Sequence, residues 1–351
     1  INKDLNYLEN SFNFSHSNDD YFFSADASMY ETLKENYNDK YEYILPEILF
    51  DRNLVQSDIF GNLDFQSNFK VNNYDTNKTS KMFINDFNWK SKDYNHKNGL
   101  VSKFIGNIKN VNFDTKNISE FKETKTNEIH GAIGYLSELE LIKKKTSLNS
   151  QSLLTPKLLV RYAPGSMRKE IEGSRLTTDN AFTLDRSNQS YNLEKGLSAS
   201  VGFDYELSKE DKLFQFSLGQ IINEKENKNM PGNTGLQKKF SDLVGTSNLK
   251  ISENLNIKYN FSLDQNYNDL NYNEVVSTLN FEKLSLDFNY LQEKKHIGNN
   301  EYFKTNLSYE TNANQKFSFE NKRNLIRDAS EYYNLSYEYH NDCLRAALVF
   351  R

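Results

Sequence analysis

The feature of this sequence that most limits its possible folds is a strict alternation of apolar and polar residues. The segment 255–263 places Leu, Ile, Tyr, Phe and Leu at its odd positions and Asn, Lys, Asn and Ser between them. The same pattern recurs at 197–208, 214–219 and 283–290. A period of two puts one kind of residue on each face of a β-strand and does not fit a helix.

Roughly 18 such segments follow one another along the chain, most of them about 8–12 residues long when matched to a strand template. Strands of globular proteins are typically shorter, about 5–6 residues. Long strands with one apolar and one polar face are typical of transmembrane β-barrels, in which lipid offers no hydrogen bonds and every backbone group must pair within the sheet. The pattern therefore predicts an all-β fold: part of one large antiparallel transmembrane β-barrel with apolar faces toward lipid and polar faces toward a wet lumen.

The composition supports this interpretation and excludes others. Hydrophobic residues make up only 37% and mean hydropathy is −0.79, yet the chain has 25 Phe and 22 Tyr, which disordered chains lack. The net charge of −5 and the absence of a basic block argue against a nucleic-acid partner. No apolar run approaches the ~20 residues of a membrane helix. No signal peptide is visible and both ends look strand-like, so we expect a fragment of a longer protein.

A soluble β-sandwich or solenoid with one buried face would also alternate. Three features favour the barrel: the many long strands, the lack of a fully apolar central strand, and aromatic residues near the expected strand ends, where an interfacial girdle would place them. These aromatic residues are Tyr41, Tyr43, Phe50, Tyr290, Tyr302 and Tyr309. The long polar breaks at 165–189 and 223–239 fit the long loops of one barrel end.

No motif for catalysis, cofactor binding or metal binding is present. The chain has no Walker loop, no GxGxxG and no HExxH, and its histidines are not at metal-ligand spacing. We interpret these histidines as surface or lumen residues: His16, His96, His130, His296 and His340. A triad assembled across strands is recognised only by geometry. A barrel enzyme therefore remains open from the residues alone, as does a generic outer-membrane channel or receptor.

Five segments, in this order, carry a family resemblance: YEYILPEILF at 41–50, LLTPKLLVRYAPG at 153–165, NAFTLDRSNQSYNLEKGLSASVGFDYEL at 180–207, LGQIIN at 218–223 with MPGNTGLQKKFSDLVG at 230–245, and YEYHNDCLRAALVFR at 337–351. Together they resemble the LptD family of lipopolysaccharide (LPS) assembly proteins, also called organic solvent tolerance proteins, and most closely its alphaproteobacterial branch. The residues that match the family's motifs are Pro46, Pro156, Tyr162, Pro164, Gly165, Asp185, Arg186, Gly219, Gln220, Gly235, Ser241, Asp242 and Gly245.

The resemblance implies a function. LptD proteins form very large barrels in the Gram-negative outer membrane and receive LPS from a periplasmic bridge of LptA-like jellyroll proteins. They release it into the outer leaflet through a lateral opening between the first and last strands, and an LptE-like lipoprotein usually plugs the lumen. No covalent chemistry on the lipid and no cofactor is involved, and the energy comes from an ATPase at the inner membrane. The resemblance thus implies a transporter and not an enzyme, with LPS and outer-membrane lipid as partners.

The resemblance also implies that residues 1–351 are part of one barrel domain. The N-terminal periplasmic jellyroll, the first strands and the final strand would lie outside this sequence. The only cysteine, Cys343, is similar to a family cysteine that pairs with one in the periplasmic domain, although position 342 is Asp where some members have a second cysteine. From the residues alone, Cys343 is equally a free small residue at a strand–turn corner. We expect it at the barrel end that carries the short turns.

Proline restricts where strands can run, because it cannot donate to a β-ladder. We therefore expect Pro156 and Pro164 at a strand start, an edge, a bulge or a turn. Residues 163–165 are expected to form a turn in which Gly165 takes a positive φ.

Overall fold

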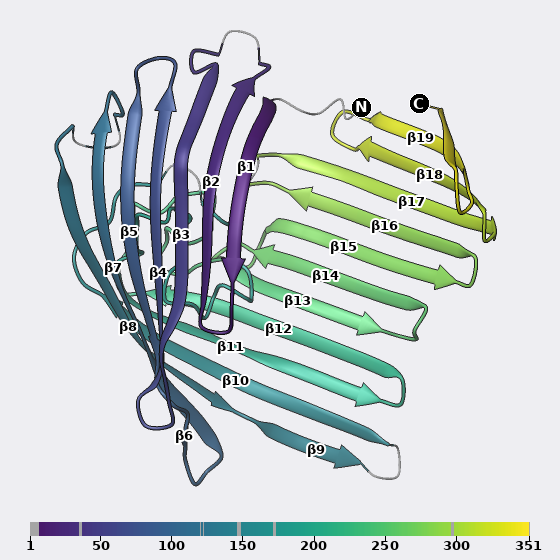
Figure 1. Ribbon diagram of the computed structural model, residues 1–351. Coiled ribbons are helices and arrows are strands. Elements are labelled where there is room, and N and C mark those ends of the chain that lie inside the picture. Colours follow the sequence, from purple (N-terminus) through teal and green to yellow (C-terminus); the bar gives the residue numbers. More distant parts are fainter. Residues whose placement is uncertain are drawn as a thin grey trace.

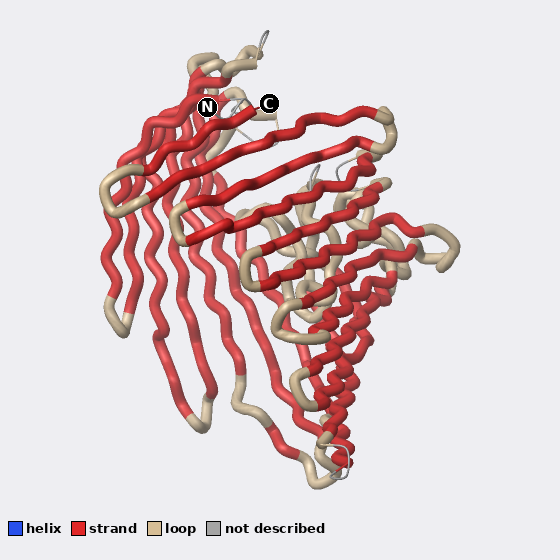
Figure 2. Tube along the Cα trace, turned by 90° about the vertical axis from the view of Figure 1, so that its right-hand side faces the viewer, coloured by secondary structure: helices blue, strands red, loops and turns tan. Residues whose placement is uncertain are grey.

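The computed structural model describes residues 7–350 except 35–36, 120, 122, 146–148, 171–172 and 296–297. Within these residues the fold is all-β, with 20 strands in one sheet and no helix (Figures 1 and 2). In the described part of the chain no helix is long and apolar enough to cross a membrane. His296 lies outside the described residues. The strands are β1 (Tyr7–Ser17), β2 (Tyr21–Thr32), β3 (Tyr41–Ser57), β4 (Gly61–Tyr74), β5 (Thr79–Lys90), β6 (Tyr94–Asn95), β7 (Leu100–Lys116), β8 (Thr126–Leu139), β9 (Leu141–Lys145), β10 (Ser150–Ala163), β11 (Gly196–Lys209), β12 (Lys212–Asn223), β13 (Leu243–Lys250), β14 (Leu255–Leu263), β15 (Leu270–Phe281), β16 (Leu284–Glu293), β17 (Asn300–Asn312), β18 (Gln315–Asn324), β19 (Ala329–His340) and β20 (Arg345–Phe350).

The sheet is an antiparallel meander. Each strand pairs with the next along the chain, apart from β6 and β9, which are short extensions beside β7 and β10, so that β5 pairs with β7 and β8 with β10. Setting these two aside leaves 18 strands, which agrees with the sequence pattern. The sheet curves round to form a wide wall of steeply tilted strands (Figures 1 and 2). Among the described residues, β1 pairs only with β2 and β20 only with β19.

The connections between strands alternate between two barrel ends. At the first end most are short turns, such as 210–211, 282–283, 313–314 and 341–344, and we call it the short-turn end. The opposite end carries the connections 117–125, 164–195 and 224–242, and we call it the long-loop end. The division matches outer-membrane barrels, whose loops are short on one side and long on the other.

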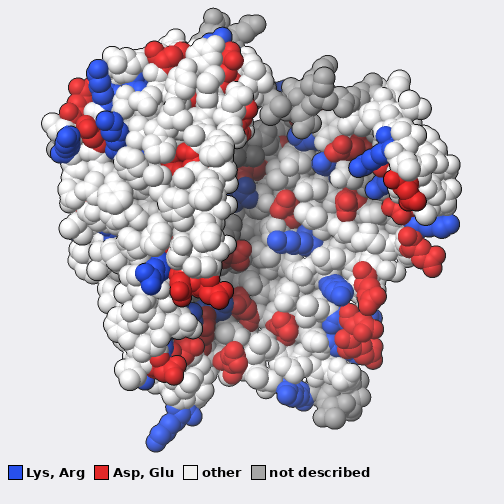
Figure 3. Space-filling model, viewed as in Figure 1, with Lys and Arg blue, Asp and Glu red and all other residues white. Residues whose placement is uncertain are grey.

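The two faces of the strands are distributed as the alternation predicts. Ser198, Ser200 and Ser262 are buried against groups inside the curved wall, whereas Leu197 and Val201 on the opposite face are 41% and 38% exposed. The outer face of the N-terminal strands is largely free of charge, and Lys, Arg, Asp and Glu gather on the inner wall of the C-terminal half (Figure 3).

One girdle residue is an exception. Tyr302 lies directly opposite buried Leu291, and the ammonium of Lys322 is 4.6 Å from the centre of its ring. Tyr302 therefore faces the lumen and not lipid. Tyr302 lies two residues before lumen-facing Lys304 on the same strand, so the two side chains point to the same face. Being near the end of the strand does not decide which face a residue takes.

Pro156 and Pro164, which we placed by their missing donor, lie where the ladder is interrupted, and so does Pro46. Pro46 falls in a register shift of β3 against β4. Pro156 lies opposite Phe203 of β11, but on its other side it falls between the β9 pairs, which end at Leu154, and the β8 pairs, which begin at Lys157. Pro164 follows the last residue of β10, and Gly165 has φ 94° as expected.

Part of the lumen is dry, which the alternation does not predict. The described residues of the connections 117–125, 164–195 and 224–242, here called the luminal loops, fold back inside the wall (Figures 1 and 2). Their apolar side chains pack on inward-facing residues of β5 to β13. The loop residues in these clusters are Ile118, Phe121, Met167, Leu176, Ala181, Phe182, Leu184, Tyr191, Leu193, Met230 and Leu236.

Candidate functional site: the anchors of the luminal loops

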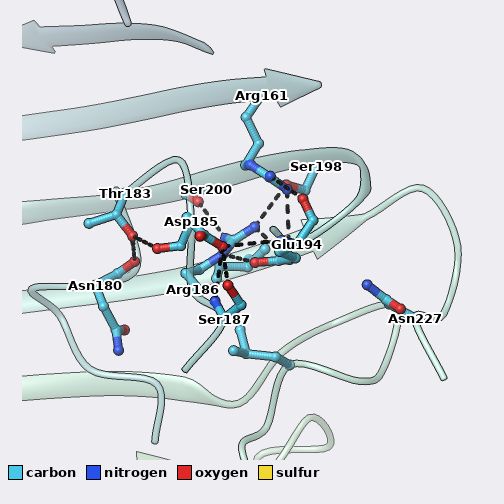
Figure 4. Close-up of polar contacts among 12 residues, drawn as sticks. Arg161, Asn180, Thr183, Asp185, Arg186, Ser187, Glu194, Ser198, Ser200 and Asn227 are labelled. Atoms are coloured by element: carbon cyan, nitrogen blue, oxygen red, sulfur yellow. Dashed lines mark hydrogen bonds and ion pairs between the residues drawn. The ribbon is translucent and has the colours of Figure 1, made fainter. Parts of the chain in front are cut away.

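The first anchor is a buried ion pair within the loop 164–195. The guanidinium of Arg186 donates to both carboxylate oxygens of Glu194, at 2.5 Å from Nε and 2.8 Å from Nη2 (Figure 4). The same guanidinium reaches the hydroxyls of Ser198 and Ser200 at 3.2 and 3.5 Å. Both serines lie on the inner face of β11, so the polar face of this strand holds the loop against the wall. A two-point Arg–carboxylate contact fixes geometry as well as charge.

Two cations of the barrel wall complete this anchor. Arg161 of β10, only 1% exposed, donates from Nη2 to the backbone oxygen of Glu194 at 2.6 Å. Lys109 of β7 donates to the carboxylate of Asp185 at 3.1 Å and to the backbone oxygen of Asn192 at 2.9 Å. Asp185 also accepts the backbone N–H of Glu194 at 3.1 Å. Three strands and one loop thus share one buried charge network.

The second anchor holds the loop 224–242 at its C-terminal end. The carboxylate of Asp242 accepts from the amide of Asn271 at 2.6 Å and from the hydroxyl of Ser262 at 3.1 Å. The backbone N–H of Asp242 donates to the carbonyl of Gly235 at 3.2 Å. Gly235 has φ 77°, and a Cβ there would lie 2.9 Å from Cγ of Asp242. Only glycine therefore fits this close approach of loop backbone to the carboxylate.

Ser241 and Gln220 join the same loop to the rim of β12. The Ser241 hydroxyl accepts the backbone N–H of Ile221 at 2.8 Å, and the Gln220 amide donates to the carbonyl of Ser241 at 3.1 Å. Tyr267, from the connection after β14, donates its hydroxyl to Gln220 at 2.9 Å. These polar groups replace the regular ladder where β12 ends and the chain leaves the wall.

Two further arginines of the luminal loops form ion pairs with the wall. Arg175 pairs with Glu293 of β16 at 2.9 Å and lies 3.4 Å from the ring centre of Tyr272. Arg168 pairs with Glu128 of β8 and stacks over Phe113, 4.7 Å from its ring centre.

The glycines among the family-motif residues allow close packing. A Cβ at Gly219 would lie 3.3 Å from that of Ala181, and one at Gly245 would lie 2.3 Å from the ring of Phe261.

The sequence-predicted residues divide into three groups. Asp185 and Arg186 lie in the first anchor, and Gly219, Gln220, Gly235, Ser241 and Asp242 lie in or beside the second. Tyr162 faces outward and is 51% exposed, next to the turn that Pro164 and Gly165 form. Pro46 lies in β3 and Cys343 in the turn between β19 and β20, both remote from the two anchors. Cys343 is exposed in the 341–344 turn at the short-turn end, as expected, whereas its disulfide stays a prediction.

Sequence reasoning missed the partners of these motif residues. Arg161 and Lys109 occupy inward positions of their strands, so the alternation places them on the lumen face without naming a partner. Glu194 lies inside the segment 180–207 that carries the resemblance, but nothing in its spacing marks it. In the described part of the chain no three His, Cys, Asp or Glu side chains are grouped so that they could hold a metal ion.

The inner wall of β14 to β19 has a different character from the packed side. Its charged groups pair across strands while staying accessible: Lys304 with Glu320 at 2.8 Å, with side chains 36% and 35% exposed, and Lys322 with Glu331 at 2.7 Å. Tyr332 donates to Glu320 at 3.0 Å. Figure 3 shows these strands as a charged surface behind the opening of the wall. The lumen therefore has a side filled by loops and a side lined with open polar groups.

The long, steeply tilted strands, the apolar exterior and the loop-filled polar interior define a large outer-membrane β-barrel. The chain belongs to the LptD family: the profile described as "LptD: LPS transport system D" matches residues 1–325. The match is to the family as a whole and assigns no branch within it. The family is one of LPS transport at the outer membrane.

Solved structures similar to this chain include two receptors. The siderophore receptor PirA from Pseudomonas aeruginosa is 13% identical with a TM-score of 0.46, and the match covers 98% of this chain and 71% of that one. The ferric-catecholate import receptor Fiu from E. coli K12, in its closed form, is 8% identical with a TM-score of 0.34, over 96% and 68% of the two chains. At these TM-scores neither receptor bears on what this chain binds. No curated protein matches the chain.

Proposed function

We propose that this chain is the membrane-embedded part of an LPS translocon that inserts LPS into the outer leaflet through a lateral opening of the barrel. The observation that carries this proposal is the contrast between the two faces of β14 to β19. Their inner face is an accessible array of paired charges and tyrosines, and their outer face presents residues such as Phe288, Leu307 and Phe319.

LPS likewise has a polar part, its charged saccharide, and an apolar part, its acyl chains. The saccharide can move along a polar lumen wall, whereas the acyl chains gain free energy only on the lipid side, at about 0.8 kcal/mol per buried CH₂. One molecule can occupy both sides of the wall only where neighbouring strands separate. A lateral opening between terminal strands meets this requirement, and by family resemblance those gate strands would lie outside this chain.

The packed half of the lumen limits where LPS could pass. The luminal loops cover β5 to β13, so the remaining polar surface is that of β14 to β19 and of β1 to β4, where Glu47 pairs with Lys70 at 3.1 Å. An LptE-like lipoprotein would occupy part of this open half. The short-turn end would face the periplasm and the LptA-like bridge, and an N-terminal jellyroll would dock there, tied to Cys343.

The test is site-specific photocrosslinking in cells that carry the full-length protein. A photoreactive residue at Asn306, on the inner face of β17, should form LPS adducts that disappear when ATP is depleted. The control position is Leu307, one residue on and on the outer face, where adducts should not depend on ATP. A generic channel or receptor barrel predicts no LPS adduct at Asn306, and that result would reject the proposal.

A further inference from the structure

A pocket lies on the outer face of β4 to β8, at the long-loop end of the wall. Its volume is about 370 Å³, and among the residues that line it are Phe69, Lys81, Phe83, Asn112, Asp114 and Lys125. The rings of Phe69 and Phe83 meet edge to face with their centres 6.3 Å apart, so one side of the pocket is aromatic. Figure 3 shows charged side chains gathered at the upper left, at this end of the N-terminal strands.

The register of β5 and β7 places the pocket outside the barrel and near its rim. Ile84 is buried with the luminal loops, so Phe83 and Lys81 point outward, because successive side chains of a strand alternate between its faces. Lys81 is the third residue of β5 and lies directly opposite Asp114, two residues before β7 ends. Lys125 immediately precedes β8. The polar side of the pocket therefore lies at the height at which the wall leaves the membrane.

The side-chain amides beside the pocket are unusual for a lipid-facing surface. Asn112 of β7 and Asn127 of β8 lie opposite each other, and their side chains are hydrogen-bonded. The amide of Asn112 also donates to the side chain of Asn110 at 2.7 Å and to the carbonyl of Phe83 at 3.3 Å. Hydrocarbon offers such groups no hydrogen bonds. They suit a depth at which the lipid itself carries hydroxyl and amide groups, as the saccharide end of LPS does.

The charge of the pocket favours an anion. Lys81 and Lys125 contribute two positive charges to the lining and Asp114 one negative charge. Among the residues described, no ion pair is found for either lysine. LPS matches both sides of the pocket, since it carries phosphate groups close to the point at which its saccharide joins its acyl chains.

We propose that this pocket binds one LPS molecule of the outer leaflet, with a phosphate at Lys81 and Lys125 and an acyl chain against Phe69 and Phe83. The inference rests on the proposed function for its orientation, because the long-loop end then meets the leaflet that receives LPS. It goes beyond that function, since the pocket lies on the lipid side of β4 to β8 and not on the inner wall of β14 to β19. The pocket holds LPS that has already been delivered.

The test uses the full-length protein, purified and placed in phosphatidylcholine vesicles that contain LPS at low mole fraction and no ATP. A photoreactive residue replaces Val71, which lies on the outer face of β4 directly opposite Lys81 and is not one of the proposed contacts. LPS adducts should form there, and LPS whose phosphates have been removed chemically should form several-fold fewer. A photoreactive residue at Leu263, the last residue of β14 and also on the outer face, is the control position. It should give the same yield with both forms of LPS.

Charge variants identify the groups that bind the phosphate. Lys81→Gln and Lys125→Gln should each weaken the preference for phosphorylated LPS by about fivefold in apparent affinity, and together they should abolish it. Lys81→Arg should retain the preference. Asp114→Asn should strengthen it, because the variant removes the negative charge from the lining. Lys225→Gln is the matched control and should change nothing, because this lysine lies outside the pocket and its side chain is 84% exposed.

Equal adduct yields at Val71 for the two forms of LPS would mean ordinary contact with the surrounding lipid and would overturn the proposal. So would a preference that persists in the double lysine variant. Displacement of LPS by an equal amount of phosphatidylglycerol would also overturn it, because the pocket would then take any anionic lipid. The experiment involves no transport, so a failure to find LPS adducts at Asn306 in cells would not change its result. Adducts at Asn306 without a phosphate preference at Val71 would reject this inference alone.

Discussion

Arg186 and Glu194 form a two-point ion pair with both side chains almost fully removed from solvent, 0% and 2% exposed. The pair belongs to a loop, but its surroundings belong to the wall: Ser198 and Ser200 of β11 contact the guanidinium, and Arg161 of β10 contacts the backbone of Glu194. A buried charge is tolerated only when its partners are in place. The loop and the barrel wall are therefore folded as one unit.

Glu194→Gln should destabilise the barrel strongly, by roughly 3–5 kcal/mol. It removes the carboxylate from buried Arg186 and from buried Arg161, whose Nη1 lies 3.8 Å from Oε1 of Glu194. The measurement is the urea midpoint of the folded band in unheated gel electrophoresis. The matched control is Glu338→Gln, which breaks the pair with Arg345, whose side chain is 76% exposed. It should change the midpoint little. Equal midpoints for the two variants would contradict a structural role for the anchor.

Gly235→Ala should release the loop 224–242 from Asp242. The substitution imposes a positive φ on alanine, at roughly 1–2 kcal/mol, and adds a clash with Cγ of Asp242. Limited proteolysis at Lys238 and Lys239 should become several times faster. Gly165→Ala carries the same φ strain but meets nothing within 4 Å, so it isolates the contribution of the clash. The idea fails if both variants are cleaved at the same rate.

Docking of the loop 164–195 should depend on pH through Glu170. Its backbone N–H donates to the carbonyl of Asn229 at 2.9 Å, and burial, which outweighs its hydrogen bonds from Asn188 and Asn192, raises the pKa of its carboxyl group. A pKa raised by folding gives stability that is complete below the unfolded pKa and is lost as pH rises through the folded value. Lowering the pH from 7 toward 5 should therefore tighten docking.

Hydrogen exchange of the loop amides, corrected for intrinsic rates, measures this effect. Glu170→Gln should raise protection at pH 7 and flatten the pH dependence. The exposed Glu224, 57% accessible in its side chain, provides the control substitution Glu224→Gln, which should keep the slope of the unsubstituted protein. A slope that survives in Glu170→Gln would assign the titration to another group.

The strand content of this fold can be read from the sequence because alternation fixes which face each side chain takes. Leu255–Leu263 and Gly196–Lys209 both form strands, and Ser198, Ser200 and Ser262 of their polar faces are buried inside the wall. Tyr302 shows the limit of that reasoning, since its place near a strand end indicated an interface while its register faces it to the lumen. The alternation predicts which residues share a face of the sheet, whereas nearness to a strand end does not predict whether that face meets lipid or the lumen.

The luminal loops could not be predicted in the same way. Met167, Leu176 and Leu193 are isolated apolar residues in polar segments, and no period marks them as buried. Their burial depends on the curvature of the wall behind them. Asp185 and Arg186 were found by family resemblance. Their contacts with Lys109 of β7 and with Glu194 depend on the tertiary fold, which the sequence pattern does not show.

The orientation of β14, with Ile257 toward lipid and Lys258 toward the lumen, can be tested directly. Ile257→Arg should destabilise the protein by roughly 2–4 kcal/mol if the position lies near the bilayer midplane, because a guanidinium would enter lipid. Lys258→Arg, the adjacent lumen-facing position, should cost little. Folding into vesicles across a urea series compares the two. A larger loss for the Lys258 variant would reverse the inside and outside of the sheet.

Cys343 gives the last prediction, which concerns the N-terminal periplasmic domain that the family resemblance implies. The thiol is exposed in the 341–344 turn, at the end of the barrel opposite the loops 164–195 and 224–242. If that end faces the periplasm, Cys343 can pair with a cysteine of an N-terminal periplasmic domain, and the oxidising periplasm would keep the bond. Non-reducing electrophoresis of the full-length protein should show a mobility shift on reduction that Cys343→Ser abolishes. Ser336→Ala, on the preceding strand, should leave the shift intact. A shift that remains in Cys343→Ser would assign the disulfide to other cysteines and leave Cys343 as a free surface thiol.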